Sequence, residues 1–188
     1  MFFVKLFLLF LLFFPNLYAE DELNYDKQSI EAIQKLGFSL KASVKLAMEE
    51  AGPIGAIEYC NLAALDITEE ISDSLNLNIN RTSLKTRNEK NNPDEWEKKY
   101  LLKFNEEYLS GMDIKKLFYS EVIKNDDNSK IFRFIKPIPT GKVCLKCHGS
   151  KIEEGLAFKI KELYPNDRAI GFKLGEIRGA FSVTIDLD

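Results

Sequence analysis

Histidine, cysteine and arginine are all scarce in this sequence of 188 residues. The single histidine is His148, and the three cysteines are Cys60, Cys144 and Cys147. One histidine excludes any centre that needs two imidazoles from the same chain, such as a bis-histidine iron. Three cysteines are too few for a disulfide-rich scaffold. The formal net charge is −3, and no basic cluster is present, which argues against a nucleic-acid partner.

Long hydrophobic runs are absent beyond the first twenty residues. The opening MFFVKLFLLFLLFFPNLYAE has one lysine, an apolar run over residues 6–14, a proline, and a small residue before Glu20. This layout is typical of a secretory signal peptide, and the run is shorter than the roughly 20 residues that span a bilayer. We predict that residues 1–19 are removed and that residues 20–188 form one periplasmic domain with no membrane contact. The alternative is an uncleaved anchor.

Helical periodicity dominates the first part of the predicted domain. Apolar residues recur three and four positions apart over residues 30–47 and again over residues 54–71. Gly52 and Pro53 separate the two stretches. The short connection predicts two long helices that run antiparallel as a hairpin.

A third helix is expected to begin near residue 92. Asn92 is a good N-cap, Pro93 suits the first helical position, and Glu95 is placed to reach back to the cap. Aromatic residues then repeat every four positions over residues 96–108, a pattern that we assign to the core.

Strand patterns dominate the remainder. Residues 117–124 and 131–136 flank a polar turn and predict a hairpin. Apolar and polar residues alternate over residues 181–187, which predicts a strand with one buried face. Helices followed by a mostly antiparallel sheet predict the α+β class.

The segment KVCLKCHGS, residues 142–150, contains a C-x-x-C-H motif. In this spacing each thiol can add to one vinyl group of a haem, and the following histidine lies under the iron. The motif therefore predicts one covalently bound haem c, attached through Cys144 and Cys147, with His148 as the proximal ligand. Haem of this type is attached outside the bacterial cytoplasm, in agreement with the predicted signal peptide.

Two other interpretations of the motif remain open. A thiol–disulfide pair usually lies at the N-terminus of a helix within a βαβ unit, whereas glycine, proline and serine flank the motif here. A zinc site is conceivable from Cys60, Cys144, Cys147 and His148. Adjacent ligands at positions 147 and 148 are awkward for tetrahedral coordination.

The opposite side of the iron has several candidate ligands. Met48, Met112, the lysines and Cys60 all remain, as does an open position. Cys60 has no disulfide partner if the other two cysteines carry haem. It is either a small buried hydrophobe or an iron ligand on the second helix, where Ala63 and Ala64 leave room for a flat macrocycle.

Arginine is used sparingly beside 21 lysines. The five arginines, all outside the first two helices, are Arg81, Arg87, Arg133, Arg168 and Arg178. A guanidinium grips a carboxylate with two parallel hydrogen bonds, and a haem carries two propionates. We predict that Arg81 and Arg87 either bind the propionates or contact the residues that ligate the iron. The alternative is that they tie loops to surface acids.

Six segments of the chain resemble a known family. They are AIEYCNLAA, RTSLKTRNEKNNPDEWE, FRFIKPI, CLKCHG, YPNDRAIGF and GEIRGAFSV, in this order between residues 56 and 183. They resemble the c-type-haem, PAS-like domain family of unknown function, known from a cyanobacterial haem protein. The resemblance implies a PAS-like antiparallel sheet preceded by long helices. It also implies one covalent haem attached through Cys144 and Cys147, with His148 as proximal and Cys60 as distal ligand.

The predicted function follows from this ligand set. A thiolate ligand stabilises ferric iron, and filled axial positions disfavour catalysis, so we predict no catalytic residues. The lead hypothesis is a periplasmic sensor of redox state or of a small gaseous ligand, acting through ligand exchange at Cys60. The alternatives are a soluble electron carrier and a haem-free thiol oxidoreductase. The redox or signalling partner and the oligomeric state stay unspecified.

Overall fold

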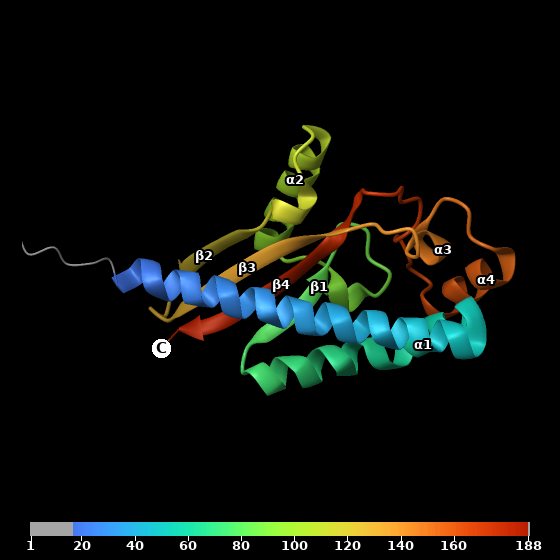
Figure 1. The fold of residues 1–188 in the computed structure, drawn as a ribbon, viewed down its shortest axis with the longest axis horizontal. Helices are drawn as coiled ribbons and strands as arrows, with labels where there is room; N and C mark the ends of the chain where they lie inside the picture. Colours follow the sequence, from blue (N-terminus) through green and yellow to red (C-terminus); the bar gives the residue numbers. More distant parts are fainter. Residues whose placement is uncertain (1–16, 188) are drawn as a thin grey trace, which may run out of the picture.

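A four-stranded antiparallel sheet lies between helices in the computed structural model, which describes residues 17–187 (Figure 1). The elements in chain order are α1 (Leu17–Leu75), β1 (Asn78–Thr82), the 3₁₀ helix η1 (Glu89–Asn91), α2 (Glu95–Leu109), the 3₁₀ helix η2 (Ile114–Lys116), β2 (Tyr119–Lys124), β3 (Lys130–Pro139), α3 (Leu145–His148), α4 (Glu154–Leu163) and β4 (Ile177–Leu187). The strand order is β1-β4-β3-β2. The α+β class, with an antiparallel sheet after long helices, is confirmed.

The predicted signal peptide falls largely outside the described residues. Only its last three residues, 17–19, are described, and α1 begins with them. Among residues 17–187, no helix is both long and apolar enough to cross a membrane.

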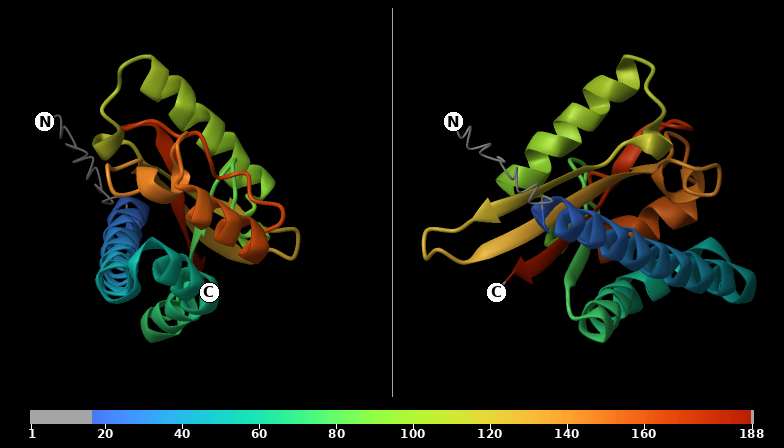
Figure 2. Two further views of the ribbon diagram at one scale, coloured as in Figure 1. Left: turned by 90° about the vertical axis from the view of Figure 1, so that its right-hand side faces the viewer. Right: turned by 60° about the vertical axis from the view of Figure 1, so that its left-hand side comes forward.

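The helix α1 is bent back on itself into the predicted hairpin. The break lies at Gly52, whose φ of 66° and ψ of −167° are not helical, and Pro53 follows it. Residues with a side chain rarely adopt this positive φ, so glycine suits the position. Lys35 of the first arm donates a 2.8 Å hydrogen bond to Ser74 near the end of the second. This contact confirms that the arms run antiparallel (Figure 2).

The two faces of the sheet are covered by different helices. Neighbouring residues on a strand point to opposite faces. Phe134 of β3 packs into a core with both arms of α1, including Leu36 and Ile71. Its neighbour Ile135 packs instead against α2, including Phe104. The aromatic stripe of α2 is therefore core, as predicted.

The start of α2 differs from the prediction. Asp94, rather than Asn92, is the N-cap, and its carboxylate accepts a 2.7 Å hydrogen bond from the backbone of Glu97. Glu97, rather than Glu95, reaches back to the cap backbone at 3.1 Å. A carboxylate next to the positive end of a helix is favourable. The side chain of Asn92 is engaged elsewhere, because it accepts a hydrogen bond from Thr86.

The strand predictions are confirmed in type but not in bounds: β2 begins two residues later than expected, whereas β3 and β4 are longer. The β2–β3 hairpin and the terminal strand β4 are present, and β4 begins four residues earlier than expected. The structure adds β1, which pairs with β4, and α4, which packs against α1. Helices α3 and α4 lie together near the bend of α1, beyond one end of the sheet (Figure 1). The C-x-x-C-H segment is therefore close to the second arm of α1.

Removal of core volume under the hairpin should destabilise the protein. Leu36 is fully buried between the arms of α1 and the sheet, so Leu36→Ala should lower the free energy of unfolding by about 2–5 kcal/mol. Leu46 lies on the same arm but is 55% exposed, so Leu46→Ala is the matched control. Chemical denaturation monitored by circular dichroism measures both. Equal effects of the two substitutions would contradict the placement of the core.

Candidate functional site

The C-x-x-C-H segment folds as a short helix whose end is held against a distant loop. In α3, the backbone of His148 donates to Cys144 at 2.9 Å and that of Gly149 to Leu145 at 3.0 Å. Beyond the helix, Phe172 donates from its backbone to the carbonyl of His148 at 3.0 Å. A Cβ at Gly149 would lie 2.5 Å from the Leu145 carbonyl oxygen, so this close approach requires glycine.

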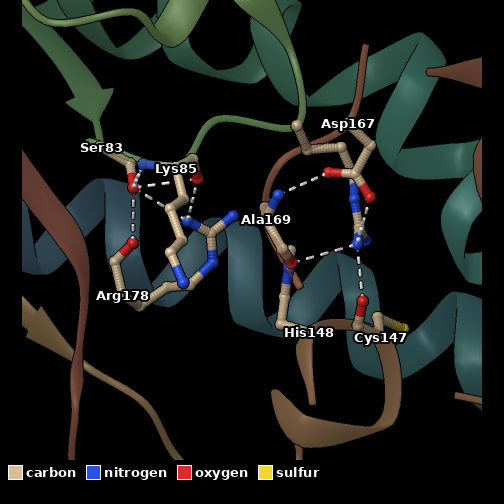
Figure 3. A network of polar contacts seen from close by, with 8 residues as sticks. Ser83, Lys85, Cys147, His148, Asp167, Ala169 and Arg178 are labelled. Atoms are coloured by element: carbon tan, nitrogen blue, oxygen red, sulfur yellow. Dashed lines mark hydrogen bonds and ion pairs between the residues drawn. The ribbon is translucent and has the colours of Figure 1, made fainter. Parts of the chain in front are cut away.

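The imidazole of His148 is oriented by one backbone carbonyl. Its Nδ1 lies 2.7 Å from the carbonyl oxygen of Ala169, which can only accept, so Nδ1 carries the proton (Figure 3). Burial lowers the pKa of His148 to about 2, and the charges of Arg178, Arg87 and Arg81 act in the same direction. The ring is therefore neutral at physiological pH, and its Nε2 presents a lone pair. A neutral imidazole with a hydrogen-bonded Nδ1 is the usual form of a metal-ligating histidine.

Arg87 joins the C-x-x-C-H helix to the loop that orients His148. Its Nη2 donates to the carbonyl of Cys147 at 2.6 Å and forms an ion pair with Asp167 at 3.1 Å. The carboxylate of Asp167 also accepts from the backbone of Ala169 at 2.8 Å. The side chains of Arg87 and Asp167 are only 8% and 6% exposed. This buried pair fixes the spacing between the two segments that meet at His148.

Arg81 lies near the same cluster but has no counterion there. Its Nε is buried without a hydrogen-bond partner, and no other residue of the described range 17–187 forms an ion pair with its guanidinium. Burial lowers the pKa of Arg81, while Cys60 and Tyr164 act weakly against this. An unpaired buried guanidinium is costly, so an anion at this position would be stabilising.

Cys60 belongs to the second arm of α1 and is brought near the motif. Burial raises the pKa of its thiol, Arg81 and Arg87 lower it, and Cys147 raises it. Cys147 packs against a cluster that includes Ile57, one turn before Cys60. The structure thus brings together Cys60, Cys147 and the arginines singled out in the sequence.

The three cysteines are free thiols, and Cys144 is the N-cap of α3, so the helix N-terminus expected of a thiol–disulfide pair is present. Other observations disfavour the two alternative interpretations of the motif. Burial raises the pKa of Cys147, which is opposite to the shift that activates a thiol for exchange. In the part of the chain that the structure describes, no three histidine, cysteine, aspartate or glutamate side chains lie close enough to form a metal cluster. The zinc interpretation needed four such ligands together.

Sequence reasoning missed Arg178, Ser83 and the role of Asp167. Arg178 lies on β4, and its Nη1 is 3.3 Å from the hydroxyl of Ser83, which in turn donates to the Arg178 carbonyl at 2.8 Å (Figure 3). The scarcity of arginine was a signal for Arg178, since only five are present. Asp167 looked like part of a turn, and nothing local indicated that its partner is 80 positions away.

These residues fit a haem that is attached through the motif. Cys144 and Cys147 are free and lie three positions apart on one short helix, and Nε2 of His148 carries a lone pair. The unpaired guanidinium of Arg81 provides positive charge for an acidic ligand group. A half-buried thiol, Cys60, faces the same cluster from α1.

Comparisons with known proteins agree with this arrangement. A family model described as Tll0287-like matches residues 17–186. The fold is similar to the crystal structure of the cyanobacterial heme-protein Tll0287, with a TM-score of 0.64 and 21% sequence identity. The superposition covers 93% of this chain and 98% of the other. No curated protein sequence matches the chain.

Loss of the buried carboxylate of Asp167 should lower the free energy of unfolding far more than loss of an exposed carboxylate. Asp167→Asn leaves the charge of Arg87 buried without its partner, and the free energy of unfolding should fall by about 3–5 kcal/mol. Glu49 pairs with Lys45 on the surface, so Glu49→Gln is the control and should change it by less than about 1 kcal/mol. Urea denaturation of both variants makes the comparison. Similar values for the two would contradict the role of the Arg87–Asp167 pair.

Proposed function

The chain belongs to the Tll0287-like family, and we propose that it is a periplasmic haem protein of the c type with His148 and Cys60 as axial ligands. The observation that carries the proposal is the neutral imidazole of His148, oriented by Ala169 beside two free thiols in C-x-x-C-H spacing. The similarity to a cyanobacterial heme-protein supports it. A bound haem supplies an iron that changes oxidation state and can take a small ligand.

Each side chain of the motif has a separate task. Cys144 and Cys147 would hold the haem through two thioethers, each formed by addition of an S–H group across a vinyl double bond, for which no external oxidant is needed. His148 offers Nε2 to the iron because the carbonyl of Ala169 holds its Nδ1 proton. Arg87 and Asp167 hold the loop that contains Ala169 against the helix α3. The imidazole of His148 therefore retains one orientation.

Cys60 connects the site to the helical hairpin. Its arm of α1 packs on the sheet through Ala64 and Ile71, so a change of contact at Cys60 acts directly on a long rigid element. Burial raises the pKa of the free thiol, which disfavours a thiolate unless positive charge compensates it. This balance suits a ligand that can be released, and it supports a sensor of redox state or of a small gaseous molecule. The alternative is an electron carrier that keeps both ligands.

Covalent attachment should be visible in the mass of the protein. When the chain is produced in a host that matures cytochromes, its intact mass after denaturation should include one haem, and its pyridine haemochrome spectrum should be of the c type. Cys144→Ala/Cys147→Ala should lose this mass gain. Cys60→Ala should retain it, which separates attachment from ligation. A colourless wild-type protein whose thiols at 144 and 147 are both free to alkylate would falsify the proposal.

Replacement of Cys60 should change the coordination and the reduction potential of the iron without releasing the haem. Cys60→Ala should alter the ferric optical spectrum and raise the reduction potential, because a thiolate ligand stabilises ferric iron. Thr68→Ala is the control, since Thr68 is buried on the same arm two turns further on. Spectra of Cys60→Ala that equal those of the wild type would remove Cys60 from the coordination sphere.

The biological role is tested on the wild-type protein with carbon monoxide. Rapid binding to the reduced form indicates a labile ligand and supports the sensor. Absence of binding indicates that both ligands are retained and supports the electron carrier.

A further inference from the structure

Positive charge is concentrated around His148 beyond what the surrounding acids neutralise. Arg87 contacts the carbonyl of the neighbouring Cys147, and the guanidinium of Arg178 lies 5.1 Å from the centre of the Phe172 ring, which is 6.4 Å from the centre of the His148 ring. The charges of both, and that of Arg81, lower the pKa of His148. The carboxylate that does reach this group is Asp167, which is paired with Arg87. Three guanidinium charges against one carboxylate leave a formal excess of two. The whole chain, by contrast, is acidic, with a net charge of −3.

The three arginines differ in whether a carboxylate neutralises them. Arg87 is paired, because its Nη2 contacts Asp167 as well as the Cys147 carbonyl, although its Nε is also buried without a hydrogen-bond partner among the described residues. Arg178 uses only Nη1, which is 3.3 Å from both the Ser83 hydroxyl and the Lys85 carbonyl (Figure 3). Its Nε and Nη2, like the whole guanidinium of Arg81, donate to nothing else within residues 17–187. Within residues 17–187, Arg81 and Arg178 therefore have no carboxylate partner, whereas Arg87 has one.

The sheet fixes the backbone of both arginines. Arg81 is on β1 and Arg178 on β4, and the two strands pair with Arg81 opposite Phe181. Ser83, which follows β1, bonds both the backbone carbonyl and the side chain of Arg178. Gly179 allows this approach, because a Cβ there would lie 2.3 Å from the Thr82 carbonyl oxygen. Both guanidiniums thus belong to strand residues rather than to loop residues.

We propose that Arg81 and Arg178 are the pair that binds the two propionate carboxylates of the haem, and that Arg87 is a positioning residue for α3. The inference rests on the proposed function and adds the residues that fix the orientation of the macrocycle. An excess of two positive charges matches two carboxylates, and a guanidinium fork matches the planar carboxylate with two parallel hydrogen bonds. Lys85 does not take this role, because its side chain is exposed and an ammonium lacks the planar fork of a guanidinium.

Conservative replacement of each arginine tests the assignment. Arg81→Lys and Arg178→Lys keep the charge but lose the fork, so covalent haem should remain while the propionate bands in the resonance Raman spectrum shift. Arg168→Lys is the matched control, because Arg168 is exposed and contacts only the side chains of Thr86 and Asn92. Its propionate bands should equal those of the wild type. Far-UV circular dichroism verifies the fold of every variant.

The outcomes separate this inference from the proposed function. Shifted bands in Arg81→Lys and Arg178→Lys, with unchanged bands in the control, support the assignment. Folded variants that carry haem and show wild-type propionate bands overturn it and leave the haem protein intact. A shift of equal size in Arg168→Lys also overturns it, because the effect would then not depend on Arg81 and Arg178. Absence of covalent haem from the wild-type protein removes the proposed function itself.

Discussion

The candidate site depends on the hydrogen bond between Nδ1 of His148 and the carbonyl of Ala169. Without it, the only imidazole of the chain would have neither a defined tautomer nor a defined direction. The Arg87–Asp167 pair fixes the position of Ala169, and the backbone of Phe172 holds the carbonyl of His148. Three independent contacts therefore converge on one short helix of four residues. Such a helix has little stability of its own, so the distant loop provides the rigidity.

Electrostatics gives the site a second constraint. Burying three guanidiniums with one carboxylate is unfavourable, because one negative charge does not compensate their mutual repulsion and desolvation. Natural proteins retain such a cost where a ligand offsets it. Lysine is the default cation of this chain, and the rare arginines Arg81, Arg87 and Arg178 gather where rigid bidentate donors are useful. The distribution of charge thus supports the proposed acidic ligand, as the spacing of the cysteines supports the proposed thioethers.

The helical hairpin links the site to the rest of the fold. Its second arm contains Cys60 and, further along, Ala64 and Ile71, which pack against the main core. The first arm closes the same core with Leu36. Cys60 therefore belongs to a packed element rather than to a loop.

Periodicity and motif spacing were sufficient for much of this protein. The hairpin of α1, its break at Gly52, the aromatic face of α2 and the β2–β3 hairpin all follow from local patterns, because each depends on residues within a few positions of one another. The cap of α2 was misassigned because Asn92 and Asp94 are both good caps, and a contact to Thr86 decided between them. The strand β1 is short, and Leu156 and Ile160 are the only buried residues of α4, so neither element had a strong signal.

The sequence by itself determined the chemistry that is available: two thiols and an imidazole in one motif, a lone cysteine on a helix, and five arginines. Only the tertiary structure decided which of these meet. Arg87 and Asp167 are 80 positions apart, and Ser83 and Arg178 are 95 apart. The pairing of β1 with β4 and the packing of the loop on α3 bring them together. Such contacts depend on chain topology, which no local spacing encodes.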